Sequence, residues 1–328
     1  MNKFLSILLA TFLLTTIIIL FFLLVSQPKK IKVDNETRIK YYLGSLIDSN
    51  YHKTLTFKSK NKNLESGHNC YDDDLNKILE KCKPQSDKTL SIPFACGDVN
   101  MNMETPTYTK TRPIFNGKKI SNNVLLPLET HRHLDFAEEI YFRKVFEKDW
   151  YLKSEKLVWR GADTGNPKEP LSHSRFRFVE LYFNKKWCDI AFSEILQGNT
   201  SYKSMMRSKI NKSDLLNHKY LISIEGNDVA SNLKWMLTSN SVVLMPRPTM
   251  ESWYMEGLLI PYIHYVPINH TFDDLEEKWY WCQNNQDKCI EISNNATMFM
   301  EQFFDSHNEL DIACEVMKRV DEIYQRRI

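Results

Sequence analysis

The chain has 328 residues, with 43 basic and 41 acidic side chains and a formal net charge of +2. So small an excess of positive charge gives no indication of nucleic-acid binding. Behind an apolar N-terminal segment about 300 residues remain, enough for one large domain or two ordinary ones.

The apolar segment runs from Phe4 to Val25 and carries no charged side chain. A run of about 20 such residues can span a bilayer. The segment is longer than the apolar core of a typical signal peptide, and no small-x-small cleavage site follows it. The sequence therefore predicts an uncleaved membrane anchor over residues 1–26, with a cleaved signal as the alternative, and a polar stem over residues 27–62.

Charge and cysteine patterns disagree about the side of the membrane. Lys29, Lys30 and Lys32 after the span outnumber Lys3 before it, which mildly favours a cytosolic body. Seven cysteines and five N-x-S/T sequons favour the endoplasmic reticulum or Golgi lumen, or the envelope of a bacterium. The sequons are at Asn35, Asn199, Asn211, Asn269 and Asn295. Local disulfides Cys70–Cys82 and Cys282–Cys289 and reduced packing cysteines are equal alternatives.

The region before Trp150 contains few clear strands. Apolar runs predict a strand over Leu90–Cys96, which ends at Gly97-Asp98, and another over Asn123–Leu128. The periodic apolar residues from Phe136 to Trp150 predict a helix.

The region after Trp150 has a more regular pattern. The predicted elements are a strand at Leu157–Trp159, a turn-rich loop to Gly165, a helix at Arg175–Phe183, a strand at Cys188–Phe192, a loop with a short helix at Gly198–Asn217, and helices at Asp273–Cys282 and Leu310–Tyr324.

Strand and helix alternate between Lys219 and Ile268, as in a parallel sheet with crossover helices. The predicted elements are a strand at Tyr220–Ile224, a helix at Val229–Leu237 capped by Asp228, a strand at Ser241–Met245, a helix from Thr249 to before Pro261, and a strand at Tyr262–Val266. Ligands of such sheets bind at the carboxyl ends of the strands, where Glu225–Asp228 and Arg247–Glu251 fall. We expect the functional site to be built partly there.

These elements predict an α/β fold of two lobes with a central cleft. The first lobe covers residues 63–150, and a second α/β lobe covers residues 151–328.

Two loops at strand ends have features of ligand sites. Trp159–Gly165 offers backbone N–H groups and the Arg160 guanidinium, which suit a phosphate or a sugar hydroxyl. Gly226–Ser231 precedes a predicted helix whose N-terminal N–H groups suit a diphosphate. The second loop lacks the G-x-G-x-x-G spacing, which disfavours a nicotinamide dinucleotide. An ordinary turn is the alternative for both loops.

Asp98 follows a predicted strand and a glycine, so its carboxylate is a candidate general base. The alternative is a turn-forming aspartate that bonds its own backbone.

Two patterns suggest metal ligands, and we expect neither to be a metal site. Asp72-Asp73-Asp74 precedes Leu75, and acidic residues there suit a helix N-terminus. His131 and His133, even with Asp135, fall short of a four-ligand site.

An ordered set of motifs spans roughly Phe94 to Phe304. The motifs are FACGD (Phe94–Asp98), KTRP (Lys110–Pro113), VWRGADTG (Val158–Gly165), the stretch Arg175–Val179, YLISIEGNDVASNLKWML (Tyr220–Leu237), SVVLMP (Ser241–Pro246), ESWYMEGLLIPYIHYVPI (Glu251–Ile268) and Asp274-Leu275. The set resembles glycosyltransferase family 90, which includes protein O-glucosyltransferases, fungal capsule-associated proteins and lipopolysaccharide-modifying transferases. No single motif is specific, whereas their order and spacing are.

The resemblance implies a GT-B-like fold with two Rossmann-like lobes and an inverting transfer from a nucleotide-activated sugar, typically a UDP-sugar. It makes Asp98 the base that deprotonates the acceptor hydroxyl. The donor-binding residues that it implies are Trp159, Arg160, Gly161, Ala162, Thr164, Gly165, Arg175, Gly226, Asn227, Asp228, Val229, Ala230, Ser231, Asn232, Glu251 and Tyr254.

One position departs from the family pattern, because several relatives carry an arginine where Asn232 stands. The charge facing the diphosphate would then come from Arg175, Arg177, Lys234 or Arg247. An inverting displacement needs one base, and N–H groups with a guanidinium can carry the charge of the leaving group. We therefore expect no required cofactor and no metal beyond the UDP-sugar co-substrate.

The sequence thus predicts a membrane-anchored inverting glycosyltransferase that moves glucose or xylose from a UDP-sugar to a hydroxyl of a protein or glycan acceptor. The expected partners are the nucleotide sugar, the acceptor and, through Phe4–Val25, the lipid bilayer. Two alternatives are a non-catalytic sugar- or glycoprotein-binding module on the same fold and another nucleotide-binding α/β transferase, such as a phosphotransferase.

Overall fold

The computed structural model describes residues 32–46, 71–82, 94–114, 121–130, 143–165 and 175–325. Residues 32–328 form one compact unit. The predicted anchor Phe4–Val25 and most of the predicted stem lie outside the described residues. Among the residues that are described, no helix has the length and apolar character needed to cross a membrane.

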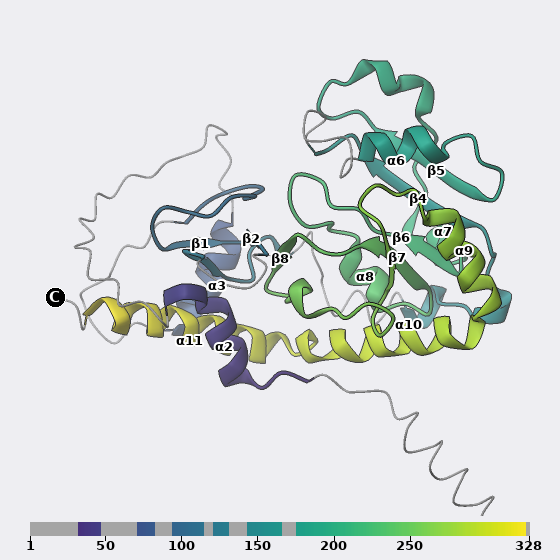
Figure 1. The fold of residues 1–328 in the computed structure, drawn as a ribbon. Coiled ribbons are helices and arrows are strands. Elements are labelled where there is room, and N and C mark those ends of the chain that lie inside the picture. The colour runs from purple at the N-terminus through teal and green to yellow at the C-terminus, as the bar shows by residue number, and fades with distance from the viewer. Residues whose placement is uncertain are drawn as a thin grey trace, which may run out of the picture. The chain divides into compact units, whose positions relative to one another are not determined.

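The largest sheet of the described residues, called the central sheet below, has five parallel strands and lies in the right-hand part of Figure 1. Its strands are β4 (Leu157–Ala162), β5 (Cys188–Glu194), β6 (Tyr220–Ile222), β7 (Val242–Pro246) and β9 (Val266–Ile268), in the order β5-β4-β6-β7-β9. The strands read as apolar runs because they are buried on both faces, as in other parallel sheets. The alternation predicted from the sequence is confirmed for β4, β5, β6 and β7.

Helices pack against this sheet along its length. α6 (Arg175–Tyr182) packs against β5, α8 (Leu233–Leu237) and α10 (Gln286–Met300) pack against β7, and α9 (Leu275–Asn284) packs against β9. The shorter helical turns are η2 (Trp150–Leu152), η4 (Thr200–Met205), α7 (Lys212–Leu215), η5 (Glu256–Leu258) and η6 (Glu301–Phe303). The sequence pattern did not predict α10, whose asparagines weaken the helical signal.

Two small sheets lie outside the central one. β1 (Thr107–Thr109) and β3 (Asn123–Leu125) are parallel, and β2 (Thr111–Pro113) and β8 (Met250–Ser252) are antiparallel. The β2–β8 pair joins the KTRP motif to the segment after β7, across the expected boundary at Trp150. The arrangement as two Rossmann-like lobes stays a prediction.

Three helices bring the two ends of the described chain together. α11 (Ser306–Gln325) packs against both α2 (Asn35–Leu43) and α3 (Asp72–Cys82), and η1 (Gly44–Leu46) follows α2 (Figure 1). Arg38 of α2 is buried against Glu309 of α11, with Nη2 and Oε2 2.6 Å apart.

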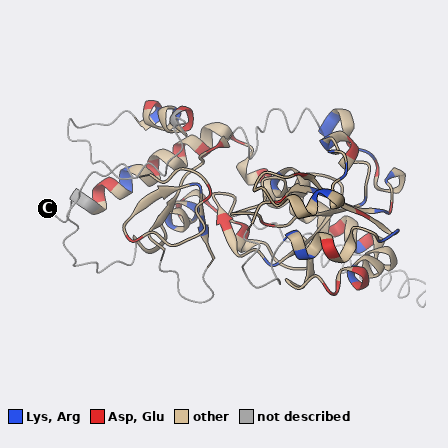
Figure 2. Ribbon diagram, turned by 90° about the horizontal axis from the view of Figure 1, so that it is seen from above, with Lys and Arg blue, Asp and Glu red and all other residues tan. Residues whose placement is uncertain are grey.

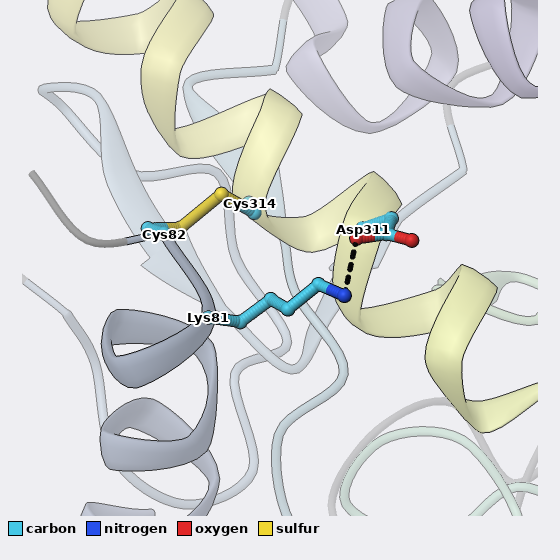
Figure 3. Close-up of a disulfide and its surroundings, with 4 residues drawn as sticks. All are labelled: Lys81, Cys82, Asp311 and Cys314. Carbon is cyan, nitrogen blue, oxygen red and sulfur yellow. Dashed lines mark ion pairs between the residues drawn. A yellow bond between two sulfur atoms is a disulfide. The ribbon is translucent and has the colours of Figure 1, made fainter.

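A disulfide joins α3 to α11 (Figure 3). It links Cys82 to Cys314, whose Cα atoms are 5.2 Å apart, and Lys81 pairs with Asp311 beside it. The predicted Cys70–Cys82 bridge is therefore wrong, because the packing of α3 on α11 gives Cys82 a partner far away in the sequence. Cys96 is also disulfide-bonded.

The predicted Cys282–Cys289 bridge is wrong as well. Both thiols are free and buried, as is Cys188. The Cys289 thiol instead contacts the Cys282 carbonyl oxygen at 3.7 Å. For these three residues the alternative of reduced packing cysteines is confirmed.

The predicted helix from Thr249 to Pro261 is also wrong. Its residues Met250–Ser252 form strand β8, which pairs with β2, and Met255 has a left-handed backbone with φ of 53°. The Glu225 carboxylate accepts hydrogen bonds from the Thr249 and Met250 N–H groups, so Thr249 does not cap a helix. The strand predicted at Tyr262–Val266 lies later, at Val266–Ile268.

Basic and acidic positions are interspersed over the described ribbon (Figure 2). This distribution agrees with the small net charge of the chain.

Candidate functional site

A cavity of about 640 Å³ lies at the carboxyl edge of the central sheet, the edge where ligands of parallel sheets bind. Each of the five strands is followed by residues that line it. They are Thr164 and Gly165 after β4, Gln197 after β5, Ser223–Asn227 after β6, Arg247–Thr249 after β7, and His270 and Phe272 after β9. The volume suits a ligand of nucleotide-sugar size.

Arg175, the first residue of α6, is a half-buried cation in the wall of this cavity. Its described hydrogen bonds go to neutral oxygens: Ile224 O at 2.8 Å, Thr164 Oγ1 at 2.7 Å and Ala162 O at 3.1 Å. Burial lowers the pKa of Arg175 to about 10, although Asp228, Asp98 and Glu225 oppose this shift. The guanidinium therefore stays charged at neutral pH. None of the three partners just named is a carboxylate.

Gly226 lets the turn after β6 approach this arginine. A Cβ atom at Gly226 would lie 2.5 Å from Thr164 Oγ1 and 3.2 Å from Arg175 Cζ. Only glycine fits the two loops together at this distance.

Asp98 lies beside the cavity, with its side chain 37% exposed. Lys110 Nζ donates to Asp98 Oδ1 and Asn227 Nδ2 donates to Asp98 Oδ2, both at 3.0 Å. Burial raises the pKa of Asp98, but the Lys110 charge and these hydrogen bonds outweigh it and leave the pKa below its usual value. Asp98 is therefore an ionised carboxylate at neutral pH that remains open to solvent.

Lys110 is fully buried and faces three carboxylates. Its Nζ lies 3.0 Å from Asp98, 2.8 Å from Glu129 and 3.2 Å from Asp228. Burial lowers the pKa of Lys110, but the Coulomb effect of Asp228, Tyr71 and Asp98 is larger and raises it. One cation thus holds a cluster with an excess of negative charge.

Asp228 is the buried member of this cluster. Its carboxylate accepts from Thr111 Oγ1 at 3.0 Å as well as pairing with Lys110. Burial raises its pKa to about 6, and the nearby Asp98 charge adds to the rise while Lys110 opposes it. The prediction that Asp228 caps a helix is wrong, because these contacts take its carboxylate and α8 begins only after Asn232.

The structure brings together part of the predicted donor set. Cavity-lining members are Thr164, Gly165, Arg175, Gly226, Asn227, Val229 and Ala230. Predicted members that do not line the cavity are Trp159, Arg160, Gly161, Ala162, Asp228, Ser231, Asn232, Glu251 and Tyr254. The helix predicted to begin at Val229 begins at Leu233, four residues later.

Trp159 and Arg160 have structural surroundings. Trp159 is 1% exposed and lies in the core, where its ring is 5.8 Å from the Arg175 guanidinium carbon. Gly161 packs on the same ring, since a Cβ there would lie 2.5 Å from Trp159 Cζ2. Arg160 Nη2 bonds both carboxylate oxygens of Asp189 at 2.9 Å.

Glu251 and Tyr254 are also held within the protein interior. Glu251 is 1% exposed and accepts from Arg112 Nε at 2.8 Å and from the Tyr41 hydroxyl. Tyr254 is 2% exposed and packs edge-on to Phe303.

Two of the proposed substitutes for the missing arginine at Asn232 line the cavity, Arg175 and Arg247. Arg247 is exposed. Lys234 is buried and pairs with Glu256 at 2.9 Å. Asn232 itself accepts from Ser223 Oγ at 3.2 Å.

In the described part of the chain, no group of three or more His, Cys, Asp or Glu side chains is arranged to hold a metal ion. Asp74 instead accepts hydrogen bonds from the Thr130 N–H group at 3.0 Å and hydroxyl at 2.5 Å. His131, His133 and Asp135 lie outside the described residues.

Comparison with known proteins adds the family. The sequence profile described as Glycosyl transferase family 90 matches residues 137–323, more than half of the chain. The chain belongs to glycosyl transferase family 90. The matched range contains Arg175, Asn227 and the cavity-lining strand ends, while Asp98 and Lys110 precede it.

Named family 90 relatives include O-glucosyltransferases. The chain is 36% identical to "O-glucosyltransferase LpsA" of Dichelobacter nodosus over 224 residues, which cover 68% of this chain and 64% of that protein. It is 22% identical to "Protein O-glucosyltransferase 3" of Homo sapiens over 231 residues, which cover 69% of this chain and 41% of that protein. An uncharacterized protein of Invertebrate iridescent virus 6, 179R, is 32% identical over 55% of this chain and 18% of its own length. The matched part of the chain thus covers less than two thirds of the length of each of these relatives.

Several residues at this cavity carried no specific prediction from the sequence. Lys110 stood only within the KTRP motif, Glu225 only within the strand-end segment Glu225–Asp228, and Gln197 and His270 had no assigned role. The last three follow predicted strands or their neighbours, so their position at strand carboxyl ends was the available signal. No local pattern marks Lys110, because its three carboxylates come from distant segments.

Proposed function

We propose that this protein is an inverting glycosyltransferase that moves a sugar from a UDP-sugar to a hydroxyl group of a protein or glycan. The nucleotide sugar would occupy the cavity at the carboxyl edge of the sheet. The names of the relatives support glucose as the sugar, and xylose is the other candidate from the sequence resemblance.

The observation that carries the proposal is the link between an ionised carboxylate and the cavity wall. Asn227 lines the cavity and donates to Asp98 at 3.0 Å, so Asp98 lies one hydrogen bond from the space for the donor. Its side chain is exposed enough to meet an acceptor hydroxyl. A general base must lie within hydrogen-bond reach of the proton that it removes.

The chemistry is a single displacement. Asp98 takes the proton of the acceptor hydroxyl, and the acceptor oxygen forms a bond to the anomeric carbon on the face opposite the UDP group. The bond from the anomeric carbon to the UDP oxygen breaks, and UDP leaves with the electron pair. The configuration at the anomeric carbon is therefore inverted.

Positive charge in the cavity supports the departure of UDP. Arg175 has a half-buried guanidinium that is bonded to neutral oxygens, and Arg247 lines the same cavity. Fixed cations in a partly enclosed site stabilise the negative charge that develops on a leaving diphosphate. The proposal needs no cofactor besides the UDP-sugar.

The protein's location is a separate proposal. The Cys82–Cys314 disulfide supports an oxidising compartment, such as the endoplasmic reticulum or Golgi lumen or a bacterial envelope. Attachment to a bilayer through Phe4–Val25 remains a prediction from the sequence. Extraction of the full-length protein from membranes by carbonate or by detergent would test it, since an integral anchor resists carbonate.

Incubation of the full-length protein with a panel of nucleotide sugars tests the function. We expect UDP release from one UDP-sugar, with UDP-glucose and UDP-xylose the first to try, and faster release when a protein or glycan acceptor is added. Transfer to the acceptor would be read by mass spectrometry. Release from no donor in the panel, with or without acceptors, would contradict the proposal.

A further inference from the structure

Asp98 belongs to a closed ring of contacts that includes two neighbouring residues of one turn. Lys110 holds Asp98 Oδ1 at 3.0 Å and Asp228 Oδ2 at 3.2 Å. Asn227, which is bonded covalently to Asp228, holds Asp98 Oδ2 at 3.0 Å. Both carboxylate oxygens of Asp98 are thus fixed from the same turn, one directly and one through Lys110.

The orientation of the Asn227 amide follows from its second partner. The backbone N–H of Gly165 donates to Asn227 Oδ1 at 2.9 Å. A backbone N–H can only donate, so the oxygen of the amide must face Gly165. The Nδ2 group must then face Asp98, where it can only donate, which requires an acceptor on the ionised carboxylate.

The turn after β6 is built to hold this amide in place. The Gly226 N–H donates to Asp228 O at 3.1 Å within the turn. Asp228, which follows Asn227, is buried and bonded to Thr111 and Lys110. Asn227 therefore has little freedom to rotate away from Asp98 without breaking the bond to Gly165.

We propose that Asn227 is a positioning residue that orients Asp98 and joins it to the Thr164–Gly165 loop of the donor cavity. This inference rests on the proposed function for its catalytic meaning. Gly165 lines the cavity and Thr164 bonds Arg175, so Asn227 connects the base to the loop beside the cation. When a donor binds against that loop, the Asp98 carboxylate is already held in a fixed orientation by Asn227.

Other charged groups also face Asp98 and set the background for its titration. Lys110 favours its ionised form, and Glu129 and Asp228 oppose it. Arg175 interacts with it at longer range, and the Tyr71 hydroxyl is bonded at the adjacent Gly97. All of these stay unchanged when only Asn227 is replaced. A change in the Asp98 titration in Asn227→Ala therefore reports the loss of the Asn227 hydrogen bond, whereas Asn227→Asp adds the repulsion of a like charge to that loss.

The first experiment measures the pKa of Asp98 without any substrate. Full-length protein labelled with ¹³C at the aspartate carboxyl carbons is titrated by NMR, and Asp98→Asn assigns the signal. Asn227→Asp keeps the acceptor for Gly165 and replaces the donor with a like charge. We expect it to raise the Asp98 pKa by roughly one unit or more, and Asn227→Ala to raise it by less.

Asn232→Asp is the matched control. It makes the same chemical change five positions along the same segment, at a side chain bonded to Ser223. We expect a smaller rise in the Asp98 pKa than for Asn227→Asp. Equal rises in the two variants, or no rise in Asn227→Asp and Asn227→Ala when circular dichroism shows both folded, would overturn the positioning role.

The second readout is the pH dependence of kcat/KM for UDP release from UDP-glucose. A higher pKa of Asp98 moves the acidic limb to higher pH, and each unit lowers the rate on that limb about tenfold. We expect the limb to shift with the NMR pKa in each Asn227 variant. An NMR shift with no UDP release from any protein, wild type included, would refute the proposed function and leave the orientation of Asp98 by Asn227 standing.

Discussion

Lys110 and Arg112 stand two residues apart in the KTRP motif, and both are buried cations, yet their surroundings differ. Arg112 is 1% exposed and pairs with one buried carboxylate, Glu251. Its other hydrogen bonds go to backbone carbonyls of Tyr41, Tyr42 and Asn123. Every charge around Arg112 is therefore matched inside the protein.

Lys110 has three carboxylate neighbours, and one of them, Asp98, reaches solvent. Its three carboxylates outnumber the one cation, and the exposed carboxylate of Asp98 brings part of this negative charge to the surface beside the cavity. The comparison teaches that burial and ion pairing alone do not mark a functional charge. A functional carboxylate is one that its partner leaves incompletely neutralised and open to a ligand.

The largest effect is expected for Lys110→Met, which leaves Asp98, Glu129 and Asp228 without their shared cation. Breaking a buried ion pair from one side costs about 3–5 kcal/mol of unfolding free energy. Transfer should fall as well, since the pKa of Asp98 would rise. Urea unfolding at pH 7 measures the first effect, with Lys288→Met as the control at an exposed pair with Glu291. A loss no larger than the control's, expected below about 1 kcal/mol, would contradict this account.

Glu251→Gln tests the other side of the comparison. It leaves the buried Arg112 charge unmatched and should lower the unfolding free energy by about 3–5 kcal/mol. Transfer per folded molecule should change much less than the stability does, because Glu251 does not line the cavity. The control is Glu155→Gln, because Glu155 also pairs with a lysine, Lys219, but its side chain is 55% exposed. A specific loss of UDP binding in folded Glu251→Gln would restore the donor-binding role predicted from sequence.

Asp228→Asn sharpens the account of the excess charge. The pKa of Asp228 in the folded protein is about 6, above the ordinary 3.8, so the folded state binds this proton more tightly than the unfolded chain. The stability that this group adds is present below about pH 4 and is lost as the pH rises through 6. The loss is roughly 3 kcal/mol at about 1.4 kcal/mol per pKa unit.

The measurement is the unfolding free energy of wild type minus that of Asp228→Asn from pH 4 to pH 7. This difference should fall with rising pH by that amount. A difference that stays constant across the range would mean that Asp228 keeps an ordinary pKa in the folded protein.

Gly226→Ala gives the smallest expected effect and tests the close approach of the two loops. The added methyl would lie 2.5 Å from Thr164 Oγ1, and overpacking of this kind costs about 1–3 kcal/mol. UDP affinity, measured by calorimetry, should weaken because Arg175 must shift. Adding Thr164→Ala removes the closest atom and should restore part of the loss, whereas equal losses in the single and double variants would place the strain elsewhere.

The central sheet could be predicted from sequence because its signals are local. Apolar runs at Leu157, Cys188, Tyr220 and Val242 each begin strands. The segment after Thr249 could not be predicted in the same way. Its strand depends on pairing with β2, about 140 residues earlier, and on the left-handed backbone at Met255.

The same distinction holds for the site. Asp98 and Gly226 carry local signals, a carboxylate and a glycine after predicted strands. The roles of Lys110, Asn227 and Glu251 depend on which distant side chains reach them, and the sequence contains no local trace of that. Family resemblance supplied a donor set, and the structure shows which of its members line the cavity.

The most direct test of the central claim is the rate of sugar transfer by Asp98→Asn at saturating UDP-sugar, measured together with UDP affinity. The variant keeps the size of the side chain and removes its basicity. The account predicts a fall in the transfer rate of about 10²- to 10⁴-fold with UDP affinity retained. Transfer at the wild-type rate would show that Asp98 is not the base.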